Sequence, residues 1–408
     1  MKAVGASKST RYCPEYSDEN FVIAGVGRVI ASASSGRDWV QQICARMGFF
    51  VSVSSFFQAL KSPRRFSLSK EVAENIRKLV DQDCDARFDP LAQHKELENY
   101  EVYASDGHSE KAAAHAKRIQ GKKYAPSYIF SLNLRSHSIA LLDVARPELK
   151  ENKKEHEISI LKRLKPSDLR LGAPKGTKVL HVYDQAVIDY LQWFKWKAKG
   201  IYIITREKVN SKAKVIGIRM VDYDDPRNTG ILADENVGVF AGVMIRRVTY
   251  QDPETGEIFS FITNQLSFPP GLIAFLYKLR WNIEKVFDEK KNKLQEKKAW
   301  ATSDVARSQQ AHFVCMAHNL MLLLERQLQA DENLRDEKNE AKRQKHLEEL
   351  RRKILENGRK PNPLVMNCIR STQRSLQFIR WLRDVLAFPT SWRAEITALR
   401  PLMARYLP

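Results

Sequence analysis

The stretch YKLRWNIEKVFDEKK, residues 277–291, sets the acid Glu284 among cations in a pattern typical of an amphipathic helix. At about 100° per residue, four side chains fall within roughly 60° of arc on one face of such a helix: Tyr277, Arg280, Glu284 and Lys291. Apolar residues at helical spacing form the adjacent face: Leu276, Leu279, Ile283, Val286 and Phe287. The pattern therefore predicts a helix whose apolar face packs on other structure, with a polar stripe along the edge of that contact.

The polar stripe suits a metal ligand flanked by groups that grip phosphate. Arg280 can hold a phosphate through two parallel hydrogen bonds, and Lys291 adds a compact positive charge. The alternative is a solvated face on which Arg280 and Glu284 form an i,i+4 ion pair. The helix by itself leaves both interpretations open.

Two further acids follow predicted strands. Asp106 comes after the β-rich run 100–104 and begins an Asp-Gly turn signal, whereas Asp184 comes directly after the run 178–183. In α/β sheets, side chains at the carboxyl ends of strands meet at one edge, where two acids can hold Mg²⁺ through carboxylate oxygens. The alternative is that each aspartate caps a turn. Two other aspartates also follow apolar residues: Asp143 and Asp189.

The order of the predicted elements indicates the fold class. Strands are predicted at 100–104, 128–134, 138–142, 178–183 and 201–204, and helices at 151–164 and 187–197. A β-rich insertion follows between Val215 and Gln265, and then helices at 310–328, 331–360, 367–386 and 392–406. The segment 331–360 is so rich in charge that a solvated helix or arm is expected. This order predicts an α/β protein in which helices flank a mixed sheet.

The charge balance favours a polyanionic partner. Lys and Arg number 68 against 48 Asp and Glu, so the formal net charge is +20 and the pI about 9.6. Nucleic acid is the expected partner, and an anionic membrane surface or a merely basic surface are the alternatives. The five cysteines form no Cys-x-x-Cys pair, which argues against a zinc ribbon or a disulfide scaffold and fits a reducing cytosol. Since no stretch approaches the ~20 apolar residues that span a bilayer, a cytoplasmic location is expected.

The spacing of the polar stripe resembles a known family signature. Tyr, two residues, Arg, three residues, Glu, six residues and Lys is similar to the signature helix of the IS-four family of bacterial insertion-sequence transposases, which belong to the DDE group. Trp281 follows the Arg, as is frequent in that family, and a β-rich insertion separates Asp184 from Glu284. The resemblance covers about residues 95–330. One departure is Val187, which stands where the family usually has an aromatic residue, and it leaves the local packing and the subgroup open.

The resemblance implies a ribonuclease-H-like fold and a catalytic triad of Asp106, Asp184 and Glu284. This triad would bind two Mg²⁺ ions, for which Mn²⁺ can substitute; one ion activates the attacking oxygen and the other stabilises the leaving oxygen. Water would cut at the transposon end, and the freed 3′-hydroxyl would then attack a second strand. Tyr277, Arg280 and Lys291 would grip phosphates. Trp281 would stack on a displaced base.

The same resemblance implies the partners and the location. They are double-stranded DNA, as terminal inverted repeats and as target, and a second copy of the chain in a synaptic complex at the bacterial nucleoid. Arg206, at a strand end, is similar to another basic position near the site, although a surface charge is an equal alternative.

Three regions are expected along the chain, namely an N-terminal helical region, a catalytic domain with its insertion at about 208–266, and a basic helical C-terminal region. Their ranges are 1–95, 96–330 and 331–408. Residues 1–35 are expected to be loosely ordered. Residues 37–65 fit either a helix-turn-helix that binds the DNA end or an ordinary pair of packed helices.

Other functions remain open at this point. A ribonuclease-H-like nuclease without strand transfer could use the same acids, and a domesticated DNA-binding protein could have lost catalysis. The intact Asp106, Asp184 and Glu284 weigh against the second of these. A basic RNA-binding protein without chemistry would leave the four-residue helix pattern unexplained.

Overall fold

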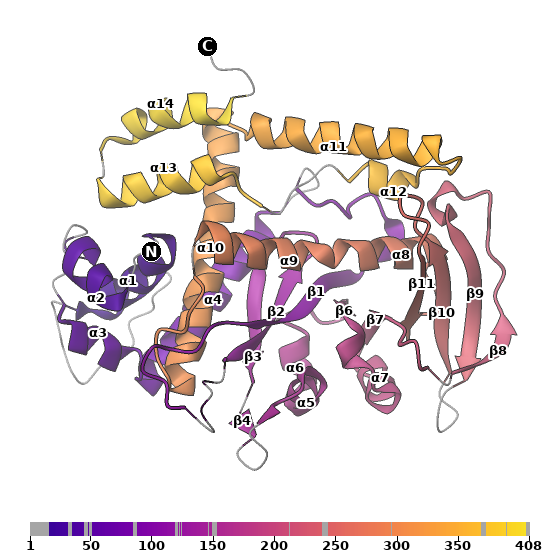
Figure 1. Cartoon of the computed structure of the whole chain (residues 1–408), viewed down its shortest axis with the longest axis horizontal. Helices are drawn as coiled ribbons and strands as arrows, with labels where there is room; N and C mark the ends of the chain where they lie inside the picture. The colour runs from indigo at the N-terminus through magenta and orange to yellow at the C-terminus, as the bar shows by residue number, and fades with distance from the viewer. Residues whose placement is uncertain are drawn as a thin grey trace.

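The structure, a computed structural model, describes residues 16–404 apart from the stretches 32–34, 45–47, 49–50, 85–87, 119–120, 122, 124, 146, 149–152, 212, 239–243, 295, 369–372 and 389. Within the described residues, nine strands form one sheet in the order β3-β2-β1-β6-β7-β11-β10-β9-β8 (Figure 1). Their bounds are β1 Tyr100–Ser109, β2 Ser127–Asn133, β3 Ile139–Val144, β6 Lys178–Tyr183, β7 Ile201–Arg206, β8 Lys214–Ile218, β9 Ile231–Gly238, β10 Met244–Gln251 and β11 Ile258–Thr263. A separate ribbon pairs β4 (Pro147–Glu148) with β5 (Lys153–Lys154).

The strand directions are those of a ribonuclease-H-like sheet. β2 runs antiparallel to both of its neighbours, β1 and β3, and β6 and β7 continue the sheet parallel to β1. The predicted insertion does not form a separate layer. It lengthens the same sheet, because β11 pairs antiparallel with β7 and β10, β9 and β8 follow in turn. The predicted fold class, a mixed sheet flanked by helices, is confirmed.

Helices cover both faces of the sheet because the strand side chains alternate between two apolar cores. One core joins Val102 and Leu180 to Ile283, and it lies under α8 (Pro270–Leu279), α9 (Trp281–Asp288), α10 (Asp304–Glu332), α11 (Glu337–Glu356) and α12 (Pro363–Met366). The opposite core joins Ile203 to Trp193, and it is covered by α5 (Glu157–Arg163), α6 (Pro166–Leu169) and α7 (Tyr190–Lys197). The segment 277–291, called the functional helix from here on, therefore lies on one defined face of the sheet.

A third core joins the two ends of the chain around α10. It contains residues of α1 (Asp18–Ala31), α3 (Val53–Ala59), α4 (Pro63–Gln82), α13 (Leu376–Ala387) and α14 (Trp392–Met403). Between α1 and α3 lie the short α2 (Gly36–Asp38) and a π-helical segment, Trp39–Cys44. Cys315 of α10 packs in the sheet core, and its neighbour Phe313 packs in this third core. Figure 1 shows α10 standing between the N-terminal helices and the sheet, with α11, α13 and α14 along the top.

Several predicted boundaries were wrong. β1 continues through the supposed turn at Asp106 and ends at Ser109. Residues 18–31, expected to be loosely ordered, form a buried helix. The charged segment 331–360 contains the predicted helix, α11, most of which is exposed, but Leu347, Leu350 and Ile354 anchor it in the sheet core. Such stripes of apolar residues are the usual reason that a charged helix packs.

Substituting Gly271 with alanine is expected to destabilise the fold by about 1–3 kcal/mol, the usual cost of overpacking. This glycine stands in the first turn of α8, and a Cβ there would lie 1.9 Å from the backbone oxygen of Arg227. Because a backbone atom cannot rotate away as a side chain can, α8 or the 3₁₀ turn Pro226–Asn228 must move. Denaturant unfolding measures the change. Gly217→Ala is the control, since its Cβ would meet nothing closer than 3.8 Å; an equal loss in both variants would contradict the steric argument.

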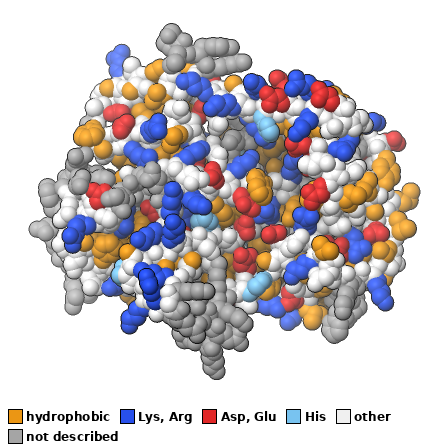
Figure 2. Space-filling view, viewed as in Figure 1, with side chains coloured by type: hydrophobic (Ala, Val, Ile, Leu, Met, Phe, Trp, Pro, Cys, Tyr) orange, Lys and Arg blue, Asp and Glu red, His pale blue; other side chains and the backbone are white. Residues whose placement is uncertain are grey.

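The surface carries both signs of charge. Figure 2 shows Lys and Arg side chains over much of the visible face, with acidic side chains grouped near its middle and at the upper right, and apolar ones along the edge formed by β8 and β9. No helix in the described part of the chain is long and apolar enough to cross a membrane.

Candidate active site

Strand register brings Asp106 and Asp184 to the same edge. β1 and β6 are parallel neighbours whose last paired residues are Ala104 and Val182. Asp106 and Asp184 each lie two residues further on, so both point to the face on which Ala104 and Val182 pack under α8 and α9. Two strands side by side therefore present one carboxylate each toward the same helix.

Arg280 joins this edge to the helix. Its guanidinium donates one hydrogen bond to Asp106 Oδ2 and one to Glu284 Oε1, both at 2.9 Å. The Arg280 residue is only 7% exposed, whereas the Glu284 side chain is 37% exposed. The i,i+4 pair that was the alternative interpretation of the helix is therefore present, but the same guanidinium also binds Asp106 across the fold. Asp106 and Glu284 consequently share one cation.

The environment of Asp106 disfavours an isolated negative charge. Burial raises the pKa of Asp106 to about 6, although Arg280 acts in the opposite direction. Glu157, at the start of α5, adds a further negative charge that raises the same pKa. Its carboxylate occupies the space beside Gly107, where a Cβ would lie 2.1 Å from Glu157 Oε1. Sequence reasoning missed Glu157 because the Asp106-Gly107 pair was interpreted as a turn; the glycine instead makes room for this carboxylate.

Asp184 lies at the open side of the site. It is exposed, accepts a hydrogen bond from the backbone N–H of Gln185, and its carbonyl oxygen accepts one from Thr205 of β7. Burial is the main reason that the pKa of Tyr277 is raised, and the charges of Arg280, Asp184 and Arg206 also act on that hydroxyl. Asp184 and Arg206 are therefore neighbours of the functional helix.

Three of the predicted DNA-contacting residues, Tyr277, Arg280 and Trp281, border a cavity. Trp281 is 57% exposed, and Tyr277 packs its ring 4.6 Å from that of Phe261. Arg206 lies over the ring of Phe259 and pairs with Glu257. Between these elements is an aromatic-lined cavity of about 300 Å³ whose wall includes Tyr277, Arg280 and Trp281. An aromatic wall beside cations can take up a base and its phosphate.

The single regular helix predicted over 277–291 was wrong in its detail. At Arg280, between α8 and α9, backbone hydrogen bonds span three residues, as in a 3₁₀ turn. After α9 the chain forms a π-helical turn, Glu289–Lys293, in which they span five. The uniform angular spacing that placed Lys291 on the stripe does not hold through that turn. Lys291 is exposed, and within the described residues no hydrogen bond or ion pair links it to the three acids. Its neighbours Glu289 and Lys290 are buried instead.

The other strand-end aspartates have structural partners. Asp143 pairs with Arg163 of α5, and Asp189 caps α7 and pairs with Lys162. Within residues 37–65, for which a helix-turn-helix or an ordinary helix pair were the alternatives, Arg64 makes a bidentate ion pair with Asp18, and Arg65 donates to the Tyr16 carbonyl. The residues between its helices, 45–47 and 49–50, lie outside the described residues.

The donor set suits a hard divalent cation. Asp106, Asp184 and Glu284 offer only carboxylate oxygens, which Mg²⁺ prefers, and a cationic guanidinium already sits between two of them. Within the described residues, no three acidic, His or Cys side chains are arranged closely enough to enclose an ion. The position between Asp106 and Glu284 is nonetheless one that favours positive charge, so the residues fit the ion.

Comparison with known proteins agrees with this geometry. Residues 92–320, more than half of the chain, match the family described as "Transposase DDE domain". The chain is also 24% identical over 152 residues to a protein of Sinorhizobium fredii named "Putative transposase y4zB", an alignment that covers 36% of this chain and 42% of that relative. The matched family region begins before β1 and ends within α10, so it contains Asp106, Asp184 and Glu284 together. The chain belongs to the family of transposases with a DDE domain.

Proposed function

We propose that the protein is a DNA transposase of the IS-four type that cuts transposon ends and joins them to target DNA in a cut-and-paste reaction. The observation that carries this proposal is the convergence of Asp106 and Glu284 on one guanidinium, with Asp184 directly after the neighbouring strand β6. Carboxylates on two strands and a helix at one sheet edge are a geometry suited to phosphoryl transfer. We assign the catalytic unit to residues 96–330.

In this proposal, Asp106, Asp184 and Glu284 hold divalent metal, Mg²⁺ or Mn²⁺. Bound there, the metal supplies charge stabilisation to the attacking and leaving oxygens of an in-line displacement. Arg280 orients Asp106 and Glu284 relative to each other and neutralises part of their charge. The buried face of α9, with Ile283 and Val286, fixes the helix on the sheet so that Glu284 keeps its position.

We assign the DNA contacts to residues beside the three acids, which range from the buried Arg280 to the exposed Trp281. Tyr277, Arg280 and Arg206 lie where phosphates of the cleaved strand would pass, and exposed Lys291 adds charge further along. We also propose that two copies of the chain hold two transposon ends, since strand joining needs both ends in one complex. The bacterial nucleoid is the proposed place of action.

The test is a cleavage and joining assay. The full chain is incubated with Mg²⁺ and duplexes that carry the inverted repeats flanking its gene, and the products are resolved on denaturing gels. Nicks at the repeat ends followed by joined products are expected. Nicks without joining would favour the ribonuclease-H-like nuclease that the same acids permit, and no nicking under any metal would overturn the proposal.

Substituting Trp281 with alanine is expected to slow cleavage about tenfold or more without loss of stability. The indole is 57% exposed, so it contributes little to the core, but it stands at the aromatic cavity where a displaced base would stack. Loss of one base–aromatic contact costs about 1–3 kcal/mol. Trp392→Ala is the control, since that tryptophan of α14 is also exposed, at 49%. Equal rates for both variants, with a 2-aminopurine probe near the cut site reporting no change in stacking, would contradict this role.

A further inference from the structure

Cations from three helices meet at the aromatic cavity beside the functional helix. Lys278 of α8, Lys285 of α9 and Arg343 of α11 all line it, together with the thiol-bearing Cys368. Lys285 directly follows Glu284, so the two side chains leave the helix about 100° apart, on adjacent flanks. The cation cluster therefore lies next to the acidic edge but is not part of it.

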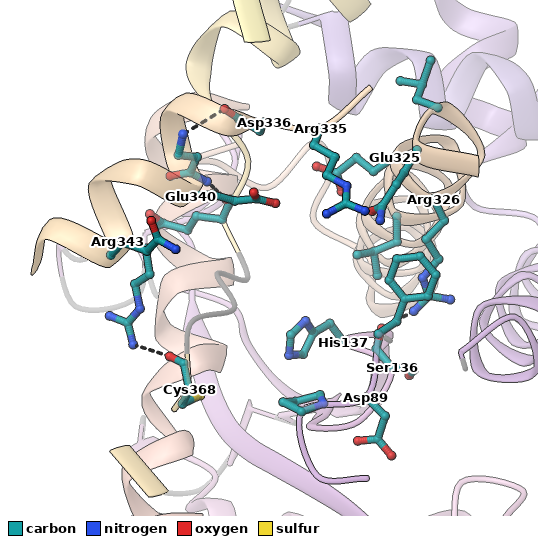
Figure 3. Close-up of a pocket in the computed structure, with 18 of the residues that line it drawn as sticks. Asp89, Ser136, His137, Glu325, Arg326, Arg335, Asp336, Glu340, Arg343 and Cys368 are labelled. Atoms are coloured by element: carbon teal, nitrogen blue, oxygen red, sulfur yellow. Dashed lines mark hydrogen bonds between the residues drawn. The ribbon is translucent and has the colours of Figure 1, made fainter. Parts of the chain in front are cut away.

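Arg343 is brought there by the packing of α11. The helix is anchored by Leu347, Leu350 and Ile354, and Figure 3 shows Arg343 extending from it toward Cys368. The guanidinium donates to the Cys368 carbonyl oxygen at 3.1 Å. Its Nε is buried and has no hydrogen-bond partner within the described residues. A buried N–H donor without a partner is costly, and an anion bound in the cavity would supply an acceptor.

The positive charges of the cluster are not balanced by ion pairs. Within the described part of the chain, no ion pair involves Lys278, Lys285 or Arg343, and the cavity wall includes a single carboxylate, that of Asp252. Lys285 and Arg343 line the same wall of this cavity. Two like charges placed together in a partly buried wall repel each other, and a bound anion would relieve this repulsion.

We propose that Lys278, Lys285 and Arg343 form an anion site that binds a phosphodiester group of the DNA strand, beside the base-stacking wall formed by Trp281. This inference rests on the proposed function for the identity of the anion. A phosphate held there lies on the flank of α9 adjacent to the acids, so the site positions the strand and takes no part in bond breaking. It also gives α11, which lies outside the matched family region, a direct role in holding the substrate.

The test measures binding of the full chain to a transposon-end duplex without metal, as a function of salt. Lys285→Gln and Arg343→Gln are each expected to weaken binding about tenfold and to reduce the slope of log K against log[salt] by about 1, the value for one lost phosphate contact. Arg351→Gln is the matched control, because it removes the same charge from an exposed position on α11. Arg343→Lys, which keeps the charge, is expected to recover most of the slope.

Alkylation of Cys368 gives a second readout. Bound DNA is expected to slow its reaction with N-ethylmaleimide at least severalfold in the wild type and not in Arg343→Gln. Wild-type affinity and slope in both glutamine variants, or an unprotected Cys368 in a complex that still cleaves, would overturn the anion site alone. Failure of the wild type to bind the duplex would instead overturn the proposed function and this inference with it.

Discussion

Asp106→Asn and Asp184→Asn variants are expected to lose strand cleavage by on the order of a thousandfold or more while still binding DNA. Both substitutions keep the shape of the side chain but remove the negative charge that a divalent cation requires. Metal-ion stabilisation of a phosphoryl-transfer transition state is worth several kcal/mol, and each 1.36 kcal/mol is a factor of ten in rate. The proposal assigns the phosphate contacts to other residues, so affinity for the duplex is expected to depend on different groups.

Cleavage is measured on a labelled transposon end and binding by band shift in the absence of metal. Glu284→Gln is expected to behave in the same way as the two aspartate variants. Asp189→Asn is the matched control, because that aspartate also stands near the end of β6 but caps α7 and pairs with Lys162. If any of the three acid variants cleaved at the rate of this control, the corresponding residue would have no place in the triad.

Arg374→Met is expected to lower the free energy of unfolding by about 3–5 kcal/mol, the usual cost of breaking a buried ion pair. Arg374 is bound to Glu289 at 2.8 Å, and both side chains are almost fully buried, at 2% and 1% exposure. A second bond at 2.9 Å reaches Glu325 of α10. Methionine fills the space of the arginine stem but leaves the Glu289 carboxylate buried without its cation.

The control for this effect is Arg352→Met on α11. Arg352 lies 3.7 Å from Glu356 with both side chains largely in solvent, so the same substitution is expected to cost about 0.5 kcal/mol or less. Urea unfolding followed by circular dichroism compares the two. Because Glu289 belongs to the π-helical turn after α9, the buried pair also fixes the end of the functional helix. If both variants lost the same free energy of unfolding, burial would add nothing to the strength of the Arg374–Glu289 ion pair.

The sequence determines the local part of the fold well and the long-range part poorly. β6 begins and ends at the predicted residues, because a short apolar run that is buried on both faces is typical of a central strand in a sheet. β1 was predicted too short, because pairing with β2 carries the strand through Asp106 and Gly107, and no local pattern reveals a partner strand. α1 was missed because Gly25 lowers helix propensity; the glycine is required where the helix approaches the ring of Phe313.

The candidate site shows the same division. Helical spacing placed Arg280 and Glu284 on one stripe, since their separation is set by local geometry alone. The bond from Arg280 to Asp106 spans 174 residues and depends on how α9 crosses the sheet. Arg343 and Cys368 carried no signal at all, because only the return of α11 across the sheet face brings them to Lys285.

The core that surrounds α10 has a kinetic consequence. In it, the side chain of Arg383 on α13 donates a hydrogen bond to the carbonyl oxygen of Ile30 on α1, a contact between residues 353 positions apart. Contacts of such long sequence separation form late and slowly, because closing the intervening loop costs entropy before any contact is gained. During synthesis, α1 can therefore make this contact with α13 only after Arg383, 353 positions beyond Ile30, has left the ribosome. A chain that ends before α13 cannot assemble this core and leaves the apolar surface of α1 exposed.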